Sequence, residues 1–478
     1  MYLPEWAQKF KEKRTEIRHI NKVYYKYEVA YKYNTLKKRT DKITIRLLGK
    51  ITEEEGFIAS EKDSLRQKAS LPPNVDIKTY GLYHLFSSLL TTELEKFKEC
   101  FKDNIAEDLF SFAMMRWAYQ SPIKRVPHYH SHDFCSEHWS TKSMSDKQIS
   151  ASLKFVGENR EMLVVWMKAM MQTPAHLANQ FVMMDSTHVT SMSELISINA
   201  KGYNPDHNFD KQIRLMYIFS AQLMQPVYYR LINGNITDIK SMALCIKEMK
   251  VQDVIYIADK GFFSKENIIE LTKQALQYII PLHRNNKLID FKPLLKANFK
   301  KELKTFFIYQ DRIIWYYQYE YEQTKLITYL DEKLKIKEET DYLLRTKTLP
   351  EEYTETKFYE KMHCFGTLTF TFFTKEKLNA QQLYEGYKQR NEVEVMFDSY
   401  KNFLKADVMY MQDRYVLEGW LSANFLAMIA YYKLFTRLKD AKLLTHWSPK
   451  DIIELSKSIY KVKINGTWNV SEITKKNS

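Results

Sequence analysis

Residues 384–407 contain four polar side chains whose spacing places them on one face of a helix: Tyr387, Arg390, Glu394 and Lys401. At about 100° of rotation per residue, the four fall within an arc of about 60°. A carboxylate among cations suits a metal-assisted reaction on a phosphate backbone, because the acid can hold the ion while the bases hold the substrate. Since any amphipathic helix can carry mixed charges, a solvent-exposed face is the alternative.

Other positions in the same stretch bear on this interpretation. Asp398 lies at about 20° on the polar face, so it could bind a metal or pair with Lys401 or Arg390. Glu392 points away from that face and is the weaker acidic candidate. The opposite side carries apolar residues that are expected to pack on a core: Val395, Met396 and Phe403.

Two apolar runs upstream, residues 181–185 and 254–259, each end in an aspartate. Both are predicted to be buried strands, and ligands of open α/β sheets bind outside the carboxyl ends of such strands. If the strands are parallel neighbours, the carboxylates of Asp185 and Asp259 lie about 5 Å apart. Two such carboxylates can bind a hard divalent cation. For either aspartate alone, a helix cap or a turn residue is the alternative.

Residues 181–282 must form the frame that holds these aspartates. Three strands, a helix, a strand, a helix and a strand follow one another, which is the order of a mixed sheet flanked by helices. The expected strands are 181–185, 193–200, 215–223 with 226–234 closing a hairpin, 254–259 and 276–282, and the expected helices are 238–249 and 265–275.

Residues 283–378 interrupt this alternation. Aromatic and β-branched runs such as residues 306–321 predict an inserted, mostly β subdomain. The helical pattern resumes at Asn379 and brings in the polar face. Residues 420–435 are then expected to form a buried helix that covers the sheet.

The composition indicates a polyanionic partner. The 478 residues carry a formal net charge of +14, with 33 Tyr, 27 Phe and 8 Trp. This favours nucleic acid ahead of an acidic membrane surface. The four cysteines form no C-x-x-C pair, which argues for a reducing compartment. Because the sequence has neither a signal peptide pattern nor an apolar run of the about 20 residues that span a bilayer, a cytoplasmic protein with no membrane segment is expected.

The first 50 residues contain 14 Lys or Arg against five acids. Strand patterns at residues 23–33 and 43–48 flank a basic turn at 34–41, and this predicts a hairpin with a cationic tip. The tip could lie along a phosphate backbone. A solvated edge strand kept soluble by lysine is the equal alternative. Consecutive prolines mark a boundary at residues 70–76.

Residues 80–172 have mainly helical spacing. Within them is a cluster of metal-binding residue types: His128, His130, His132, Cys135 and His138. Such residues can bind zinc. Their spacing matches no standard zinc finger, so a polar loop after Pro127 is the preferred interpretation.

Taken together, the motifs resemble the YREK signature of bacterial insertion-sequence transposases of the insertion-sequence-four group, in the DDE superfamily. The gaps of two, three and six residues between the four polar residues match the signature, and strands ending in D-S-T and D-K-G-F precede it in the family's order. Further similarities are the G-N-x-x-D form at residues 234–238, the basic loop at 202–207 and residues 47–60. The resemblance spans roughly residues 20–435 and is weakest in the helical region.

The resemblance implies an α/β fold with an RNase H-like mixed-sheet catalytic core, helices on both faces and a β-rich insertion before the last catalytic helix. It implies that Asp185, Asp259 and Glu394 are the catalytic acids and bind two Mg²⁺ ions, for which Mn²⁺ would substitute. By the same resemblance, Tyr387, Arg390 and Lys401 bind DNA. The implied partners are the terminal inverted repeats of a mobile element, target DNA and a second copy of the chain in a synaptic dimer.

The expected activity is metal-dependent cleavage of transposon ends and transfer of the 3′-hydroxyl into target DNA, in the cytoplasm at the nucleoid. Two alternatives stay open: a DNA-binding relic without catalysis, and a nuclease without strand transfer. The expected domains are a basic hairpin module at 1–75, a helical DNA-binding region at 76–180, the catalytic core at 181–282 and 379–440, the insertion at 283–378 and a C-terminal tail at 441–478.

Overall fold

The computed structural model describes residues 3–34, 39–62, 75–139, 144–171, 180–201, 210–236, 238–249, 254–321, 324–375, 377–464 and 466–471. Two units divide the chain: Met1–Ile77 with Val462–Asn469, and Lys78–Lys461 with Val470–Ser478. The loop at 202–207 and most of the expected boundary at 70–76 and of the basic turn at 34–41 lie outside the described residues.

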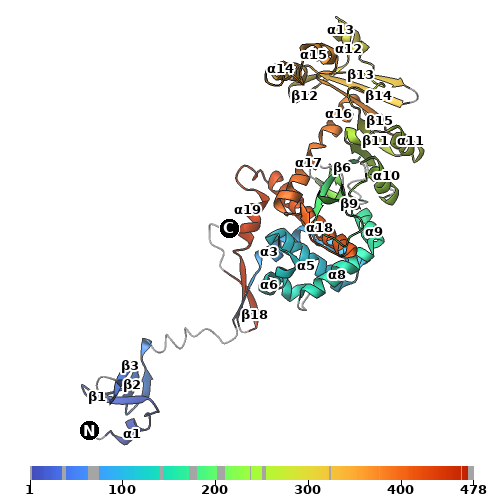
Figure 1. Cartoon of the computed structure of the whole chain (residues 1–478). Coiled ribbons are helices and arrows are strands. Elements are labelled where there is room, and N and C mark those ends of the chain that lie inside the picture. Colours follow the sequence, from blue (N-terminus) through green and yellow to red (C-terminus); the bar gives the residue numbers. More distant parts are fainter. Residues whose placement is uncertain are drawn as a thin grey trace. The chain divides into compact units, whose positions relative to one another are not determined.

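The first unit contains a four-stranded antiparallel sheet of order β1-β2-β3-β4 (Figure 1). Its elements are α1 (Glu5–Gln8), β1 (Thr15–Ile20), β2 (Val23–Asn34), β3 (Arg39–Thr52) and β4 (Gly56–Ala59). The predicted hairpin is confirmed, because β2 pairs with β3 up to Asn34 opposite Arg39. The sheet is larger than the prediction, since β1 and β4 extend it on either side.

Residues 80–172 are helical as predicted, as far as they are described. The helices are α3 (Gly81–Leu89), α4 (Thr91–Cys100), α5 (Asp103–Tyr119), α6 (Val126–His132), α7 (Cys135–His138), α8 (Asp146–Glu158) and α9 (Arg160–Met171). The expected polar loop after Pro127 is wrong, because that segment forms α6 and α7. Proline is compatible with the first turn of a helix, and His130 and Cys135 turn inward and are buried.

The sheet of the second unit is built around two parallel central strands. Its strands are β6 (Gln180–Ser191), β7 (Ala200–Lys201), β8 (Lys211–Ser220), β9 (Gln225–Asn233), β10 (Val254–Ala258) and β11 (Gln277–Pro281). β6 and β8 are antiparallel, as are β8 and β9, whereas β6, β10 and β11 are parallel. The resulting order, β9-β8-β6-β10-β11, is that of an RNase H-like fold.

The expected strand at residues 193–200 is wrong except at its last residue. β6 continues to Ser191, and the following segment is held in turns by its own polar groups. The Ser193 hydroxyl accepts the Ile196 N–H at 3.3 Å, and the Asn199 side chain donates to the Ser193 carbonyl at 2.8 Å. Ile196 and Ile198 are nevertheless buried, so the alternation of polar and apolar residues arose from a packed turn.

The helices around this sheet match the predictions closely. α10 (Asp238–Met249) precedes β10, and α11 (Lys265–Lys273) follows it, with the Ser264 hydroxyl accepting the Asn267 N–H at its start. α18 (Arg414–Asp440) is buried throughout residues 417–430, whereas both of its ends carry exposed residues. Among the described residues, no helix is long and apolar enough to cross a membrane.

The insertion extends the central sheet rather than forming a sheet of its own. Its elements are α12 (Lys292–Leu295), α13 (Phe299–Leu303), β12 (Phe306–Tyr309), β13 (Arg312–Tyr321), β14 (Thr324–Asp331), α14 (Glu332–Thr348), α15 (Glu355–Lys361) and β15 (Thr367–Phe373). β15 pairs antiparallel with β11, so the order continues as β12-β13-β14-β15-β11 (Figure 1). The insertion also carries 17 residues of helix in α14, which the mostly β prediction did not include.

The polar-face stretch is not one helix. α16 (Ala380–Lys388) ends before Arg390, α17 (Asn391–Asp398) begins after it, and a π-helix, η5 (Ser399–Phe403), follows. The chain then returns to the sheet as β16 (Val408–Met409), which pairs in parallel with Thr190 and Ser191 of β6. Residues 441–478, expected to be a tail, include α19 (Pro449–Ser456), β17 (Tyr460–Ile464) and β18 (Thr467–Val470).

Candidate catalytic site at the ends of two parallel strands

Asp185 and Asp259 occupy matching positions on neighbouring strands. β6 and β10 are parallel, and Met184 lies opposite Ala258, so the aspartates are the next residues in register. Adjacent strands lie about 4.8 Å apart. The two strands are therefore parallel neighbours, which the sequence alone left open, but β6 does not end at Asp185 as expected and continues to Ser191. The role of the two aspartates in catalysis stays a prediction.

The two aspartates make the same local contact with the backbone. The Asp185 Oδ1 atom accepts the Ser186 N–H at 2.8 Å, and the Asp259 Oδ1 atom accepts the Lys260 N–H at 2.7 Å. The second contact caps a short 3₁₀ turn, η3 (Lys260–Phe262). These bonds restrict both carboxylates, and Asp259 serves as a turn cap in addition to any role in binding.

α16 brings the polar residues against the strand that leads to Asp185. It begins with a capping box formed by Asn379 and Gln382. Gly386 lies so close to β6 that a Cβ atom there would be 2.7 Å from Cε1 of the Phe181 ring. Tyr387 is the next residue, and its ring packs on Phe370 of β15 with 4.6 Å between ring centroids. A glycine is required at position 386 because the helix could not otherwise approach the sheet this closely.

Arg390 joins two of the three predicted acids. Its Nη1 donates to Asp259 Oδ1 at 2.9 Å, its Nη2 donates to Glu394 Oε1, and its Nη1 also lies 3.4 Å from the Tyr387 hydroxyl. The Arg390 side chain is 16% exposed, against 57% for Glu394. The guanidinium therefore lies between a strand end and the helix that carries the predicted catalytic glutamate.

Electrostatics connect Asp185 to the same guanidinium. Burial alone would lower the pKa of Arg390, but the negative charges of Asp259 and, to a smaller extent, Asp185 raise it. Burial raises the pKa of Tyr387, so its hydroxyl stays neutral at physiological pH. All three predicted acids thus act on one cation, two by direct contact and one through its charge.

Lys401 and Asp398 lie apart from this cluster. Lys401 is on η5 and makes no hydrogen bond or ion pair within the described part of the chain. Asp398 accepts a hydrogen bond from the Asn402 side chain at 2.5 Å and not from the cations suggested by the sequence. The expected packing of Val395 is wrong, since it is 55% exposed, whereas Met396 is buried. The break at Arg390 and the π-helix rotate these positions away from those of a continuous helix.

The donor types fit a divalent metal, but the acids are not gathered around a single point. The carboxylates of Asp185, Asp259 and Glu394 are of the ligand type that Mg²⁺ prefers, and the Arg390 guanidinium lies between those of Asp259 and Glu394. Among the described residues, no three His, Cys, Asp or Glu side chains are close enough together to hold a metal ion. Neither the three acids nor the His and Cys residues at 128–138 therefore form a preassembled metal site in the described part of the chain.

Sequence patterns missed Arg116, a buried arginine that binds the chain directly after η5, the segment that follows the helix with Glu394. Arg116 of α5 donates to the carbonyl of Leu404, just after η5, at 2.7 Å and to the Asn424 side chain of α18 at 3.0 Å. Burial lowers its pKa to about 10. The available signal was an arginine inside the otherwise apolar run of residues 109–118.

A second arginine that the sequence patterns missed, Arg160, joins three further elements. It begins α9, pairs with Glu248 of α10 at 2.9 Å, donates to the Tyr229 carbonyl of β9 at 2.9 Å and pairs with Glu418 of α18. Its sequence position gave no sign of these partners, which lie far along the chain.

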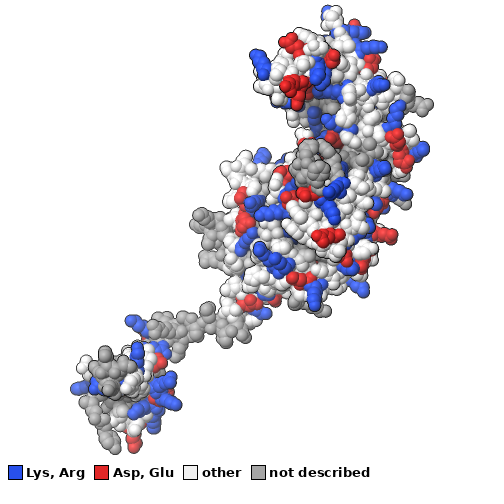
Figure 2. Space-filling view, viewed as in Figure 1, with Lys and Arg blue, Asp and Glu red and all other residues white. Residues whose placement is uncertain are grey.

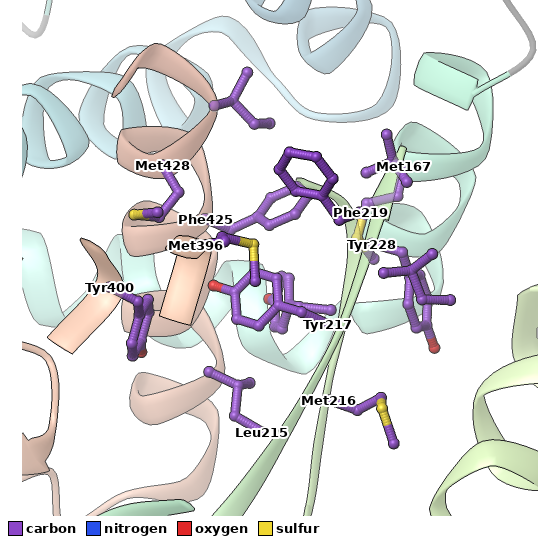
Figure 3. Close-up of a cluster of buried hydrophobic side chains, with 14 of the residues drawn as sticks. Met167, Leu215, Met216, Tyr217, Phe219, Tyr228, Met396, Tyr400, Phe425 and Met428 are labelled. Atoms are coloured by element: carbon purple, nitrogen blue, oxygen red, sulfur yellow. The ribbon is translucent and has the colours of Figure 1, made fainter. Parts of the chain in front are cut away.

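Aromatic packing fixes the buried side of α17 and η5 (Figure 3). Met396 and Tyr400 point into the cluster that surrounds Tyr217 of β8. The Tyr217 ring centroid lies 5.8 Å from that of Tyr400 and 6.0 Å from that of Phe425 of α18. α17 and η5 therefore pack against β8 through Phe397 and Tyr400, since the Phe397 ring centroid lies 5.9 Å from that of Tyr217, whereas Glu394 is exposed.

The strand order and the paired aspartates define the class of the protein first: an RNase H-like fold with one acid within β6 and a second directly after the neighbouring parallel strand β10. Residues 177–429, just over half of the chain, match the transposase DDE domain family. The chain belongs to that family. The DDE part of the resemblance is confirmed, and membership of the insertion-sequence-four group stays a prediction.

Solved structures with some similarity include two transposase complexes. A cryo-EM structure of a piggyBac transposase synaptic complex with hairpin DNA is 9% identical, with 79% of each chain covered and a TM-score of 0.40. A Mos1 transposase paired-end complex with a left transposon end is 12% identical, covering 38% of this chain and 61% of that one, with a TM-score of 0.15. No curated protein sequence matches. At such TM-scores the family match alone carries the assignment.

Proposed function

We propose that this protein is a DNA transposase that uses divalent metal ions to cut the ends of a mobile element and to join the 3′-hydroxyl to target DNA. The observation that carries the proposal is the register of Asp185 and Asp259 on parallel strands, with Glu394 linked to Asp259 through Arg390. Membership of the transposase DDE domain family supports the same reaction class.

Asp185, Asp259 and Glu394 are the residues that would hold Mg²⁺, with Mn²⁺ as a substitute. Two such ions supply an activated water or 3′-hydroxyl and stabilise the leaving oxygen of a phosphodiester. The backbone contacts of the two aspartates restrict their carboxylates at neighbouring positions, one within β6 and one directly after β10. Arg390 and Tyr387 lie next to them and are proposed to bind the phosphates of the DNA end, with Lys401 further along the same segment.

The proposed partner is double-stranded DNA, both element ends and target, bound by a dimer of the chain. The net charge of +14 supports a polyanionic partner. Figure 2 shows Lys and Arg spread over the visible face among Asp and Glu rather than gathered in one patch. The proposed DNA contacts therefore rest on the three acids and on the neighbouring cation Arg390 rather than on a basic surface patch.

The test is incubation of the purified protein with DNA that carries the element's ends and Mg²⁺. Asp185→Asn, Asp259→Asn and Glu394→Gln are each expected to lower cleavage by about 100-fold or more while DNA binding is kept. Asp398→Asn is the matched control, because this acid lies on the same helix, is exposed and already accepts a hydrogen bond from Asn402; it should change cleavage less than about twofold.

The products separate the proposal from its alternatives. Joined products in addition to cuts support a transposase, whereas cuts without joining identify a nuclease. DNA binding without any cut in the wild-type protein identifies a catalytically silent relic. Cleavage that survives in Asp185→Asn and Glu394→Gln would contradict the assignment of the site.

A further inference from the structure

Arg390 occupies the space in which two of the proposed metal ligands would meet. One end of its guanidinium donates to Asp259, and the other donates to Glu394. A planar guanidinium binds two carboxylates in fixed orientations, unlike the ammonium group of lysine. Its Nε atom is buried without a hydrogen-bond partner in the described chain, so the contacts of this side chain within the protein are through its two terminal nitrogens.

Each oxygen of a carboxylate has two lone pairs, so a metal ion that binds an oxygen with two hydrogen-bond donors must displace one of them. Asp259 Oδ1 already accepts hydrogen bonds from the Lys260 N–H and from Arg390. Mg²⁺ requires its oxygen ligands at about 2.0–2.1 Å in near-octahedral geometry. A positive group at hydrogen-bond distance from the same oxygen would both crowd the ion and repel it.

We propose that Arg390 competes with divalent metal ions for Asp259 and Glu394, so that it closes the site in the metal-free protein and is released toward the DNA phosphate when metal binds. The proposal rests on the proposed function and adds to it an order of events. Arg390 is thereby a positioning residue with two successive partners, carboxylates before metal binding and phosphate after it.

The break between the two helices makes this exchange possible. Arg390 is the residue that precedes α17, and α16 has ended two residues earlier, at Lys388. Its side chain can therefore turn without disrupting the interior of either helix. Without Arg390 or a metal, the carboxylates of Asp259 and Glu394 would repel each other, and the guanidinium between them offsets this repulsion in the absence of an ion.

The test measures metal binding by the full-length protein without DNA, using isothermal titration calorimetry with Mn²⁺ and with Mg²⁺. Arg390→Gln is expected to tighten binding about tenfold, because the ion no longer displaces a charge-assisted hydrogen bond. Arg390→Lys should also tighten binding, since lysine keeps the charge but cannot bridge both carboxylates. Lys260→Gln is the matched control: it removes an exposed cation next to Asp259 that makes no bridge, and should change affinity less than about twofold.

Thermal unfolding with and without metal then distinguishes a change in metal affinity from a misfolded variant. In EDTA, Arg390→Gln should unfold at a lower temperature than wild type, and saturating Mn²⁺ should raise its Tm by more than it raises that of wild type. Equal metal affinity in wild type and Arg390→Gln, or equal tightening in Lys260→Gln, would overturn the competition. Metal binding that persists in Asp259→Asn would instead contradict the proposed metal site, so the two failures are distinguishable.

Discussion

Replacing Arg116 by methionine tests whether α5 holds the segment after η5, and with it the helix that carries Glu394, in place. Arg116 is 4% exposed and connects α5 to the chain after η5 and to α18. Its Nη1 also donates to the Gln120 carbonyl at 2.9 Å. Methionine keeps the aliphatic volume but removes every donor and the positive charge of the guanidinium, whose Cζ lies 5.4 Å from the Trp420 ring centroid. The effect therefore combines lost hydrogen bonds with the removal of a buried charge.

The structure sets the expected size of this effect. The substitution leaves the Leu404 carbonyl and the Asn424 side-chain oxygen buried without their donor, and each buried acceptor left unpaired costs about 1–3 kcal/mol. Part of this is offset, because burying the charge of Arg116 is itself unfavourable and lowers its pKa to about 10. A net loss of about 3 kcal/mol in the free energy of unfolding is expected.

The assay is equilibrium unfolding in urea, followed by circular dichroism, on the wild type and two variants. Arg125→Met is the control, since Arg125 belongs to the same region but is exposed and makes no side-chain contact within the described residues; it should stay within about 0.5 kcal/mol of wild type. A loss below about 1 kcal/mol in Arg116→Met would refute the reasoning, because at least one of the acceptors must then find another donor.

Two other substitutions test local features. Gly386→Ala should lower the free energy of unfolding by about 1–3 kcal/mol and reduce cleavage, because the added methyl group meets the Phe181 ring. Gln389→Ala, at an exposed position of the same segment, is the control. Unchanged thermal unfolding and cleavage in Gly386→Ala would contradict this expectation. Burial raises the pKa of Asp133 to about 7, so the native state binds a proton that the unfolded chain has lost. Between about pH 4 and 7, the stability of wild type should therefore fall relative to Asp133→Asn by up to about 1.4 kcal/mol per pH unit; a constant difference across this range in urea unfolding would refute the assignment.

Local patterns were sufficient to predict the frame of the site. Uniform apolar runs of four and five residues, each followed by an aspartate, predicted the first half of β6 and β10, because strands buried on both faces have no polar alternation. α11 begins at Lys265 as expected, because the Ser264 hydroxyl is the natural acceptor for a free N–H in the first turn. These features depend on residues close together in sequence, and the structure reproduces them.

Local patterns also misled where packing overrode periodicity. Residues 193–199 alternate like a strand but form turns around Ser193. The stretch from Tyr384 has the spacing of one helix but is broken at Arg390 and widened at η5. There Tyr400 enters the aromatic core and Arg116 binds the Leu404 carbonyl, and both partners lie in other parts of the chain.

The sequence by itself determined which residue types could act on a phosphodiester and that Asp185 and Asp259 each follow a buried apolar run. Only the tertiary structure decided that these strands are parallel neighbours in register, and that Arg390 contacts Asp259, 131 residues away in sequence. The physical reason is that helix and strand preferences act over a few residues, whereas a site of converging charges depends on which elements pack together. The proposed competition between Arg390 and a metal ion depends on the same packing, because Asp259 and Glu394 come from different elements.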